Sequence, residues 1–272
     1  MTRVIDAHHH YWGAATAVHP GLARDYGPED LRPLLHEAGI DATVLVEAED
    51  SAQENRRLAA YAAATPTVAG VVAYAPLRKP DLDAIGDAVG VRCLVGEDPL
   101  ELDAGVFAEL AARGLTWDIV SVTREQVDAV GALADAVPEL RIVVDHLAAP
   151  PLAGGAWAPW IDALRALAAR PNVALKLSVG IAVLTRMGSW DAGAVATAVG
   201  HALEHFGPER AMLASNWPVV LLRRGYADAW RDLRAAVPPE ARDAVLGGTA
   251  ARWYGITGDQ NPGADVRPRA GR

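Results

Sequence analysis

Residues 4–10 read Val-Ile-Asp-Ala-His-His-His and predict a buried strand that ends in a group of functional side chains. Successive side chains of a strand point to opposite faces, so Asp6, His8 and His10 are expected on one face and the odd-numbered residues on the other. Two imidazoles at a strand end can bind a metal ion, polarise a carbonyl group or transfer protons near neutral pH. The alternatives are a tag remnant or a solvated strand end. Three histidines are too few for a tag, and the alternation within an apolar strand favours function.

Short apolar runs alternate with amphipathic segments rich in Ala and Leu along the whole chain. The predicted strands cover 4–8, 43–47, 70–75, 89–95, 115–121, 141–146, 173–179 and 211–216. The predicted helices cover 28–38, 51–64, a short segment after Asp81, 103–113, 124–136, 157–169, 194–206 and 226–236. Such alternation implies right-handed βαβ units and a parallel sheet, and eight repeats close a (β/α)8 TIM barrel, regular or distorted.

The alternative fold is a doubly wound open sheet. The first predicted strand is followed by no Gly-x-Gly-x-x-Gly turn, so a dinucleotide site would lack its phosphate cradle. We therefore expect a single barrel domain over residues 1–257. Residues 258–272 are rich in Gly, Pro, Asp and Arg and nearly free of apolar side chains, which predicts a mobile C-terminal tail.

Composition and charge narrow the range of partners. The chain has 272 residues, 51% of them hydrophobic, with a net charge of -9. No stripe of Lys and Arg offers a surface for phosphates, which argues against nucleic acid. No apolar run reaches the length of a membrane span, so no membrane partner is expected. The one cysteine, Cys93, allows no internal disulfide and indicates a cytoplasmic protein, while a homo-oligomer stays open.

Polar side chains gather at the C-terminal ends of the predicted strands, where (β/α)8 enzymes place their chemistry. In strand order they are His8 and His10, Glu47, Tyr74, Arg92, Asp118, Asp145 and His146, Lys176 and Ser178, and Ser215 and Asn216. A buried charge is costly unless it is paired, so a ring of such residues indicates a small polar ligand.

Several members of this ring have a structural alternative. Arg92 and Glu47 could form an ion pair inside the barrel instead of contacting substrate. Lys176 could pair with Asp145 or Asp118 in the same way. His146 could bond a loop carbonyl, but its position beside the first-strand histidines favours function.

Motifs that occur in order along nearly the whole chain resemble a known superfamily. They are Ile-Asp-Ala-His-His-His-Tyr-Trp (5–12), Asp-Leu-Arg-Pro-Leu-Leu (30–35), Val-Ala-Gly-Val-Val (68–72), Gly-Val-Arg (90–92), Gly-Leu-Thr-Trp-Asp (114–118), Val-Asp-His-Leu-Ala (144–148), Lys-Leu-Ser (176–178), Ser-Asn-Trp-Pro-Val (215–219) and Thr-Ala-Ala-Arg-Trp-Tyr-Gly (249–255). With them the chain resembles the amidohydrolase superfamily, in the lactone-hydrolase branch that includes sugar-acid lactonases and is similar to 2-pyrone-4,6-dicarboxylate hydrolase. The resemblance implies a (β/α)8 barrel that opens small polar lactones.

The resemblance also implies a mechanism, in which water attacks a lactone carbonyl that histidines and an arginine polarise. His8, His10 and His146 match the histidine positions, and Arg92 matches the arginine. Because such donors can stabilise an oxyanion themselves, no essential cofactor is expected. Zinc or manganese bound through the same three histidines is the alternative, as in a metal-dependent amidohydrolase or decarboxylase.

One residue departs from the pattern. Asn216 stands where the family usually has an aspartate that takes the proton of the attacking water, and a carboxamide is not basic near neutral pH. Asn216 could orient the water while a histidine or Glu47 acts as base, the activity could be weakened or redirected, or the protein could bind a lactone or sugar acid without turnover.

Together these observations give a set of expected roles. The sequence predicts catalytic roles for His8, His10, His146 and Asn216. It predicts substrate contacts for Arg92, Glu47, Asp118, Lys176 and Tyr74.

Overall fold

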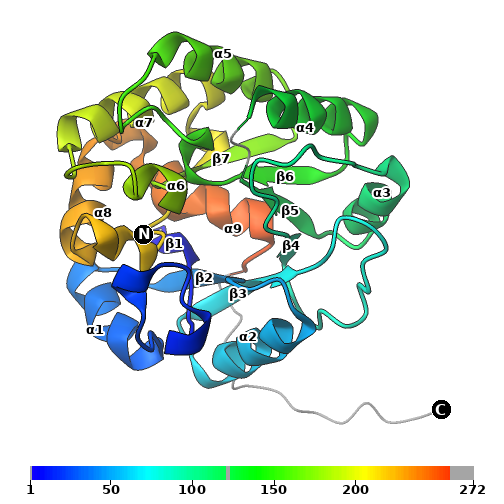
Figure 1. The fold of residues 1–272 in the computed structure, drawn as a ribbon, viewed down its shortest axis with the longest axis horizontal. Helices are drawn as coiled ribbons and strands as arrows, with labels where there is room; N and C mark the ends of the chain where they lie inside the picture. Colours follow the sequence, from blue (N-terminus) through cyan, green and yellow to red (C-terminus); the bar gives the residue numbers. More distant parts are fainter. Residues whose placement is uncertain (1, 121–122, 258–272) are drawn as a thin grey trace.

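The computed structural model describes residues 2–120 and 123–257. Its centre is a parallel sheet in which the strands follow one another in sequence order from β1 to β8 (Figure 1). The strands are β1 Ile5–His9, β2 Ala42–Val46, β3 Val68–Tyr74, β4 Gly90–Arg92, β5 Thr116–Ile119, β6 Arg141–Val144, β7 Val173–Leu177 and β8 Ala211–Leu213. The predicted (β/α)8 barrel is thus confirmed.

Helices form a ring outside the strands, and one further helix lies inside this ring in the view of Figure 1. The α-helices are α1 Pro28–Ala38, α2 Ala52–Ala64, α3 Ala104–Ala112, α4 Arg124–Ala136, α5 Trp157–Ala168, α6 Ile181–Leu184, α7 Ala192–Phe206, α8 Tyr226–Ala235 and α9 Thr249–Tyr254. Ser51, Asp103, Thr123 and Asp191 accept hydrogen bonds from first-turn amides, which explains where α2, α3, α4 and α7 begin. None of the described helices has the length and hydropathy needed to cross a membrane.

The structure corrects several predicted boundaries. The short helix expected after Asp81 is wrong, because residues 82–87 form turns and leave the β3 to β4 connection without a helix. The strands β4 and β8 have three residues each and are shorter than predicted. Helices α6 and α9 were not among the predicted helices. The predicted tail 258–272 and the end of the fifth predicted strand at Ser121 lie outside the described residues, so the division into one domain and a tail stays a prediction.

Small and β-branched side chains fill the barrel interior. Ile5 and Ala7 of β1 belong to this inner cluster, together with Val72 of β3, Val143 of β6 and Ala174 of β7. Helix α9 closes the N-terminal end of the barrel with residues of the same cluster. The opposite end of the barrel stays available for polar side chains, which is where (β/α)8 enzymes carry their sites.

A shift of register in β1 decides which of its side chains reach that end. The pairing of β1 with β2 shifts between Asp6 and His9, as in a β-bulge. Asp6 therefore faces outward, where Oδ2 accepts a hydrogen bond of 3.0 Å from the Tyr226 hydroxyl of α8. His8 faces inward, since its Nδ1 lies 3.0 Å from Lys176 Nζ of β7. The prediction that Asp6 shares a face with His8 and His10 is thus wrong, because strict alternation does not hold across a bulge.

Candidate active site

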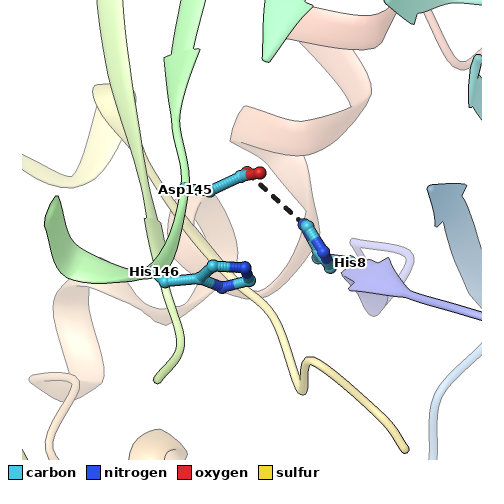
Figure 2. A group of neighbouring side chains, drawn as sticks. All are labelled: His8, Asp145 and His146. Atoms are coloured by element: carbon cyan, nitrogen blue, oxygen red, sulfur yellow. Dashed lines mark ion pairs between the residues drawn. The ribbon is translucent and has the colours of Figure 1, made fainter. Parts of the chain in front are cut away.

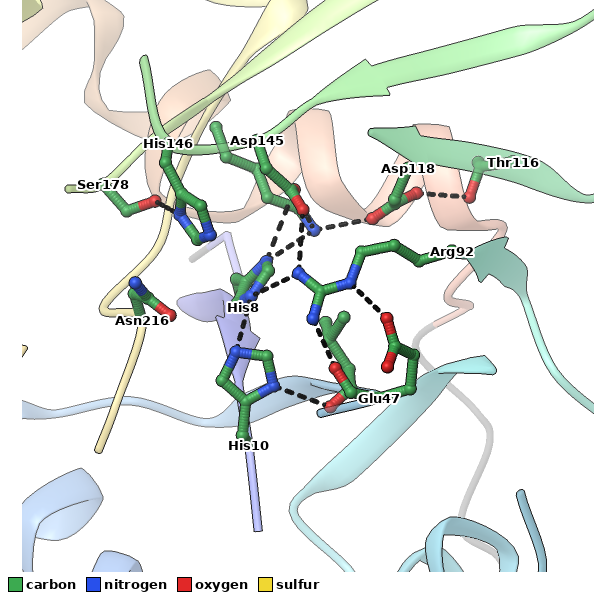
Figure 3. A network of polar contacts seen from close by, with 12 residues as sticks. His8, His10, Glu47, Arg92, Thr116, Asp118, Asp145, His146, Ser178 and Asn216 are labelled. Atoms are coloured by element: carbon green, nitrogen blue, oxygen red, sulfur yellow. Dashed lines mark hydrogen bonds and ion pairs between the residues drawn. The ribbon is translucent and has the colours of Figure 1, made fainter. Parts of the chain in front are cut away.

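The two inward histidines of β1 form a chain of hydrogen bonds (Figure 3). His10 Nδ1 lies 2.9 Å from the Val46 carbonyl oxygen, and a carbonyl only accepts, so Nδ1 carries the hydrogen. Neutral His10 then accepts at Nε2 from His8 Nε2, which is 3.0 Å away. His8 Nδ1 is left as an acceptor for Lys176 Nζ at 3.0 Å. Burial lowers the pKa of both imidazoles well below the usual range, helped by Lys176 at His8 and by Arg92 at His10.

Lys176 is the centre of a buried ion cluster beneath these histidines. Its Nζ lies 2.6 Å from Asp118 Oδ2 and 3.0 Å from Asp145 Oδ1, and all three side chains are inaccessible to solvent. The Tyr254 hydroxyl of α9 donates to Asp118 Oδ2 at 2.6 Å. Burial raises the pKa of Asp118. Although burial opposes it, Lys176 together with His8 holds the pKa of Asp145 well below its ordinary value.

Arg92 contacts two carboxylates, and its Nη1 lies 3.4 Å from His8 Nε2. Its Nε donates to Glu47 Oε1 at 2.7 Å, its Nη1 donates to Asp145 Oδ2 at 3.1 Å, and its Nη2 donates to the Glu47 carbonyl oxygen. The ion pair between Arg92 and Glu47 is therefore present, as one of the two alternatives predicted. A guanidinium has five N–H donors, and these contacts leave Arg92 with donors to spare. Burial raises the pKa of Glu47 to about 7, against the effect of Arg92.

His146 and Asn216 enter the site from the ends of β6 and β8. Both have a φ of 55°, a left-handed conformation that asparagine and histidine adopt more often than most residues, at a cost of about 1–3 kcal/mol. His146 Nδ1 lies 2.8 Å from the Ser178 hydroxyl oxygen. Asn216 Nδ2 donates to the Val179 carbonyl oxygen at 2.9 Å, which fixes the amide. Asn216 Oδ1 is buried without a hydrogen-bond partner among the described residues, so a lone acceptor is available there.

These groups form the floor of a cavity of about 250 Å³. Its lining includes His10, Arg92, His146 and Asn216, which come from four different strand ends. His8, Glu47, Asp118 and Lys176 do not line the cavity and lie buried beside or beneath this floor.

Two residues of the neighbouring strand ends lie apart from this cavity. Tyr74 is half-buried and does not line it. Burial and the nearby Asp50 carboxylate raise the pKa of the Cys93 thiol to about 12, which leaves it unreactive.

A divalent metal could be held by three neighbouring residues (Figure 2). His8, Asp145 and His146 each offer one ligand atom, and these atoms lie within 4.8 Å of one another. Histidine nitrogen and carboxylate oxygen are ordinary zinc ligands. The group differs from the one predicted, because Asp145 takes the place of His10. Its fit to a dication is poor, since Lys176 and Arg92 already contact the two oxygens of Asp145.

Three contributors could be predicted only in part or not at all. Asp145 pairs with Lys176, as one of the predicted alternatives, but its contacts with Arg92 and His8 were not predicted. Ser178 was noted at the end of the seventh strand, but only the structure shows that it touches His146. Tyr254 belongs to the motif 249–255, but its contact with Asp118 follows from the packing of α9 across the barrel, which the sequence does not show.

The fold and the histidine, arginine and carboxylate cluster at the strand ends are those of a (β/α)8 hydrolase. The sequence pattern described as amidohydrolase matches residues 5–256. The chain therefore belongs to the amidohydrolase family, which confirms the resemblance seen in its motifs.

Relatives of known sequence and structure agree with this membership. The chain is 34% identical to an L-fucono-1,5-lactonase of Burkholderia ambifaria, over 96% of this chain and 99% of that protein. It is 33% identical to an L-fucono-1,5-lactonase of Burkholderia multivorans, over 93% and 96%. A crystal structure of an amidohydrolase of Burkholderia multivorans with bound zinc superposes with a TM-score of 0.84 at 31% identity, covering 94% of this chain and all of that one.

Proposed function

We propose that this protein is a hydrolase that opens lactones by attack of water on the ring carbonyl. The observation that carries the proposal is the cavity floor, where Arg92, His146 and Asn216 present a cationic donor, an imidazole and an unpaired acceptor to the same cavity. The two lactonase relatives support it, since they match the chain over nearly their whole length. A lactone is an activated ester, so its hydrolysis requires less of the catalyst than hydrolysis of an amide.

Arg92 is proposed to bind the carbonyl oxygen. Glu47 and Asp145 hold the guanidinium in place, so its remaining N–H groups are oriented before the substrate arrives. When water adds, negative charge develops on the carbonyl oxygen. A fixed cationic donor in a site with little water stabilises that charge more than bulk solvent does.

Asn216 and His146 are proposed to handle the attacking water. Asn216 Oδ1 accepts one O–H of the water and orients it, but a carboxamide cannot take the proton. His146 Nε2 has no hydrogen-bond partner among the described residues and lies at the cavity, so it can take that proton as the oxygen–carbon bond forms. The same proton then passes to the ring oxygen as its bond to the carbonyl carbon breaks, and the product is a hydroxy acid.

His8, His10 and Lys176 are proposed as positioning residues. Lys176 fixes the hydrogen of His8 on Nε2, and His8 in turn fixes the hydrogen of His10 on Nδ1. The imidazole of His10 therefore enters the cavity in one orientation and one protonation state. Glu47 and Asp118 act through Arg92 and Lys176, and the direct substrate contacts predicted for them and for Tyr74 are not part of the proposal.

We further propose that the reaction needs no metal. Arg92 and Lys176 supply the positive charge at Asp145 that a metal ion would otherwise supply. If a divalent ion were bound, His8, Asp145 and His146 would hold it, and it would act as a Lewis acid on the carbonyl. A cytoplasmic location and a homo-oligomer both stay predictions.

The test is a lactone panel assayed with a pH indicator, which detects the acid released on ring opening. The panel contains L-fucono-1,5-lactone, D-glucono-1,5-lactone, a 2-pyrone carboxylate and simple δ-lactones. We expect ring opening well above the spontaneous rate for at least one of them. No acceleration for any compound would overturn the proposal.

Two variants test the roles of the floor residues. His146→Asn keeps a side chain that tolerates the left-handed backbone, and it should lower kcat by about 10²–10⁴-fold because the proton acceptor is lost. Asn216→Asp separates an enzyme from a binding protein. If the wild type binds lactone without turnover and Asn216→Asp creates activity, the chain is a binder and the proposed role of His146 is wrong.

A further inference from the structure

The walls of the cavity differ in character from its floor. Apart from His10, Arg92, His146 and Asn216, the described lining consists of residues without hydrogen-bonding side chains, except for the Trp12 indole. They are Trp12, Val18, Ala48, Leu94, Val120, Ala149, Gly180, Ile181, Ala182, Val183 and Val219. The Trp12 indole Nε1 already donates to the Leu22 carbonyl oxygen at 3.4 Å. Among the described lining residues, a ligand that fills the cavity therefore meets free polar side chains at the floor alone.

The exposed apolar side chains of the protein gather at the same place. Val18 and Leu94 are the large hydrophobic residues of the described chain that stand exposed, at 40% and 47%. Both line this cavity, although they come from segments far apart in the sequence. Exposed apolar surface that is concentrated at one place marks a binding site more often than chance exposure does.

A second cavity of about 580 Å³ continues the first. The two share six lining residues, which are Leu94, Val120, Ala149, Ile181, Ala182 and Val183. The second cavity adds Val95, Pro150, Pro151 and Ala153, and its charged lining residues are Glu97 and Arg186. The side chains of Glu97 and Arg186 are exposed and lie 3.8 Å apart, so they face solvent and not a buried ligand. The two cavities thus share apolar wall residues, which connect the catalytic floor with a larger space.

We infer that the preferred substrate is a lactone with an aliphatic substituent, which extends from the ring at the floor past Leu94 and Ile181 into the second cavity. This inference rests on the proposed lactone hydrolysis. A ring with several hydroxyl groups would place them against apolar walls, and a buried hydroxyl without a partner is costly. An alkyl chain has no hydrogen bonds to lose there, and its transfer from water to the apolar walls stabilises the complex.

The experiment compares δ-lactones whose alkyl substituent lengthens step by step with L-fucono-1,5-lactone and D-glucono-1,5-lactone. Each buried methylene contributes about 0.8 kcal/mol, so kcat/KM should rise by about fourfold per methylene until the chain fills the second cavity. A flat or falling dependence on chain length, with the hydroxylated lactones opened fastest, would overturn the inference and leave lactone hydrolysis standing. Absence of activity on every lactone would overturn the proposed function instead.

Substitutions of two wall residues test where the alkyl substituent of the substrate lies. Neither residue belongs to the proposed catalytic floor. Leu94→Ser changes a residue shared by both cavities, whereas Val18→Ser changes a similarly exposed residue that lines only the first. We expect Leu94→Ser to reduce the gain per methylene for long chains, and to change kcat/KM much less for δ-valerolactone, which has no substituent. Val18→Ser should leave the dependence on chain length intact. An equal loss of that dependence in both variants would show that the chain does not follow the second cavity.

Discussion

Replacing Lys176 by methionine should lower the free energy of unfolding by about 3–5 kcal/mol, the usual cost of removing one partner from a buried charge cluster. Lys176 Nζ touches Asp118 at 2.6 Å and Asp145 at 3.0 Å. Asp145 keeps Arg92 at 3.1 Å, but Asp118 keeps no cation among the described residues. Because Asp118 can take up a proton when it loses Lys176, the lower end of the range is expected at neutral pH.

The matched control removes both partners. Lys176→Met combined with Asp118→Asn leaves no uncompensated charge from this pair, so it should recover most of the lost stability. For a chain of this size 1 kcal/mol corresponds to about 2–4 °C in Tm, so the single variant should unfold roughly 6–20 °C earlier. Urea denaturation and calorimetry measure both quantities. A single variant that loses less than about 1 kcal/mol, or a double variant no more stable than the single, would refute the reasoning.

Three further predictions concern activity. As the pH falls through about 7, Glu47 takes up a proton and weakens its contact with Arg92, so kcat/KM should fall below neutral pH. The profile of Glu47→Gln, measured on the same lactone, should lack that inflection. Dialysis against a chelator should leave kcat unchanged, and metal analysis should find less than one equivalent of metal per protein. A loss of activity that zinc restores would contradict the proposal that Arg92 and Lys176 replace a metal ion at Asp145. Asn216→Leu should lower kcat more than it raises KM, because the missing acceptor orients water and does not bind substrate.

Most of the fold could be predicted from local patterns. Apolar runs bounded by turn residues located all eight strands, and the predicted starts of helices such as α2 and α4 lie within a residue or two of the observed ones. The helix predicted after Asp81 is wrong. The composition of that segment suits a helix, but residues 82–87 form turns. Helix α9 was not predicted. Its apolar residues pack against the end of the barrel, and that surface exists only once the sheet has closed.

The site could be predicted by residue and only in part by contact, since the ion pairs of Arg92 and Lys176 stood among the alternatives. The alternation rule placed His8 and His10 together correctly, and it misplaced Asp6 because a β-bulge adds a residue that periodicity does not reveal. The ion pairs of Lys176 with Asp118 and Asp145 join three strands. Which partner a buried cation takes depends on strand register across the barrel, and one sequence does not determine that register.

Two left-handed backbone positions and one buried unpaired polar atom lie where the proposed reaction takes place. His146 and Asn216 hold left-handed backbone conformations, and Asn216 Oδ1 is buried without a partner among the described residues. Each of these features costs stability, and the ion pairs beneath the floor fix the backbone and side chains around them. A site that only packed the barrel end would relax these features. Their retention beside Arg92 is what a preorganised site for a developing oxyanion and an attacking water requires.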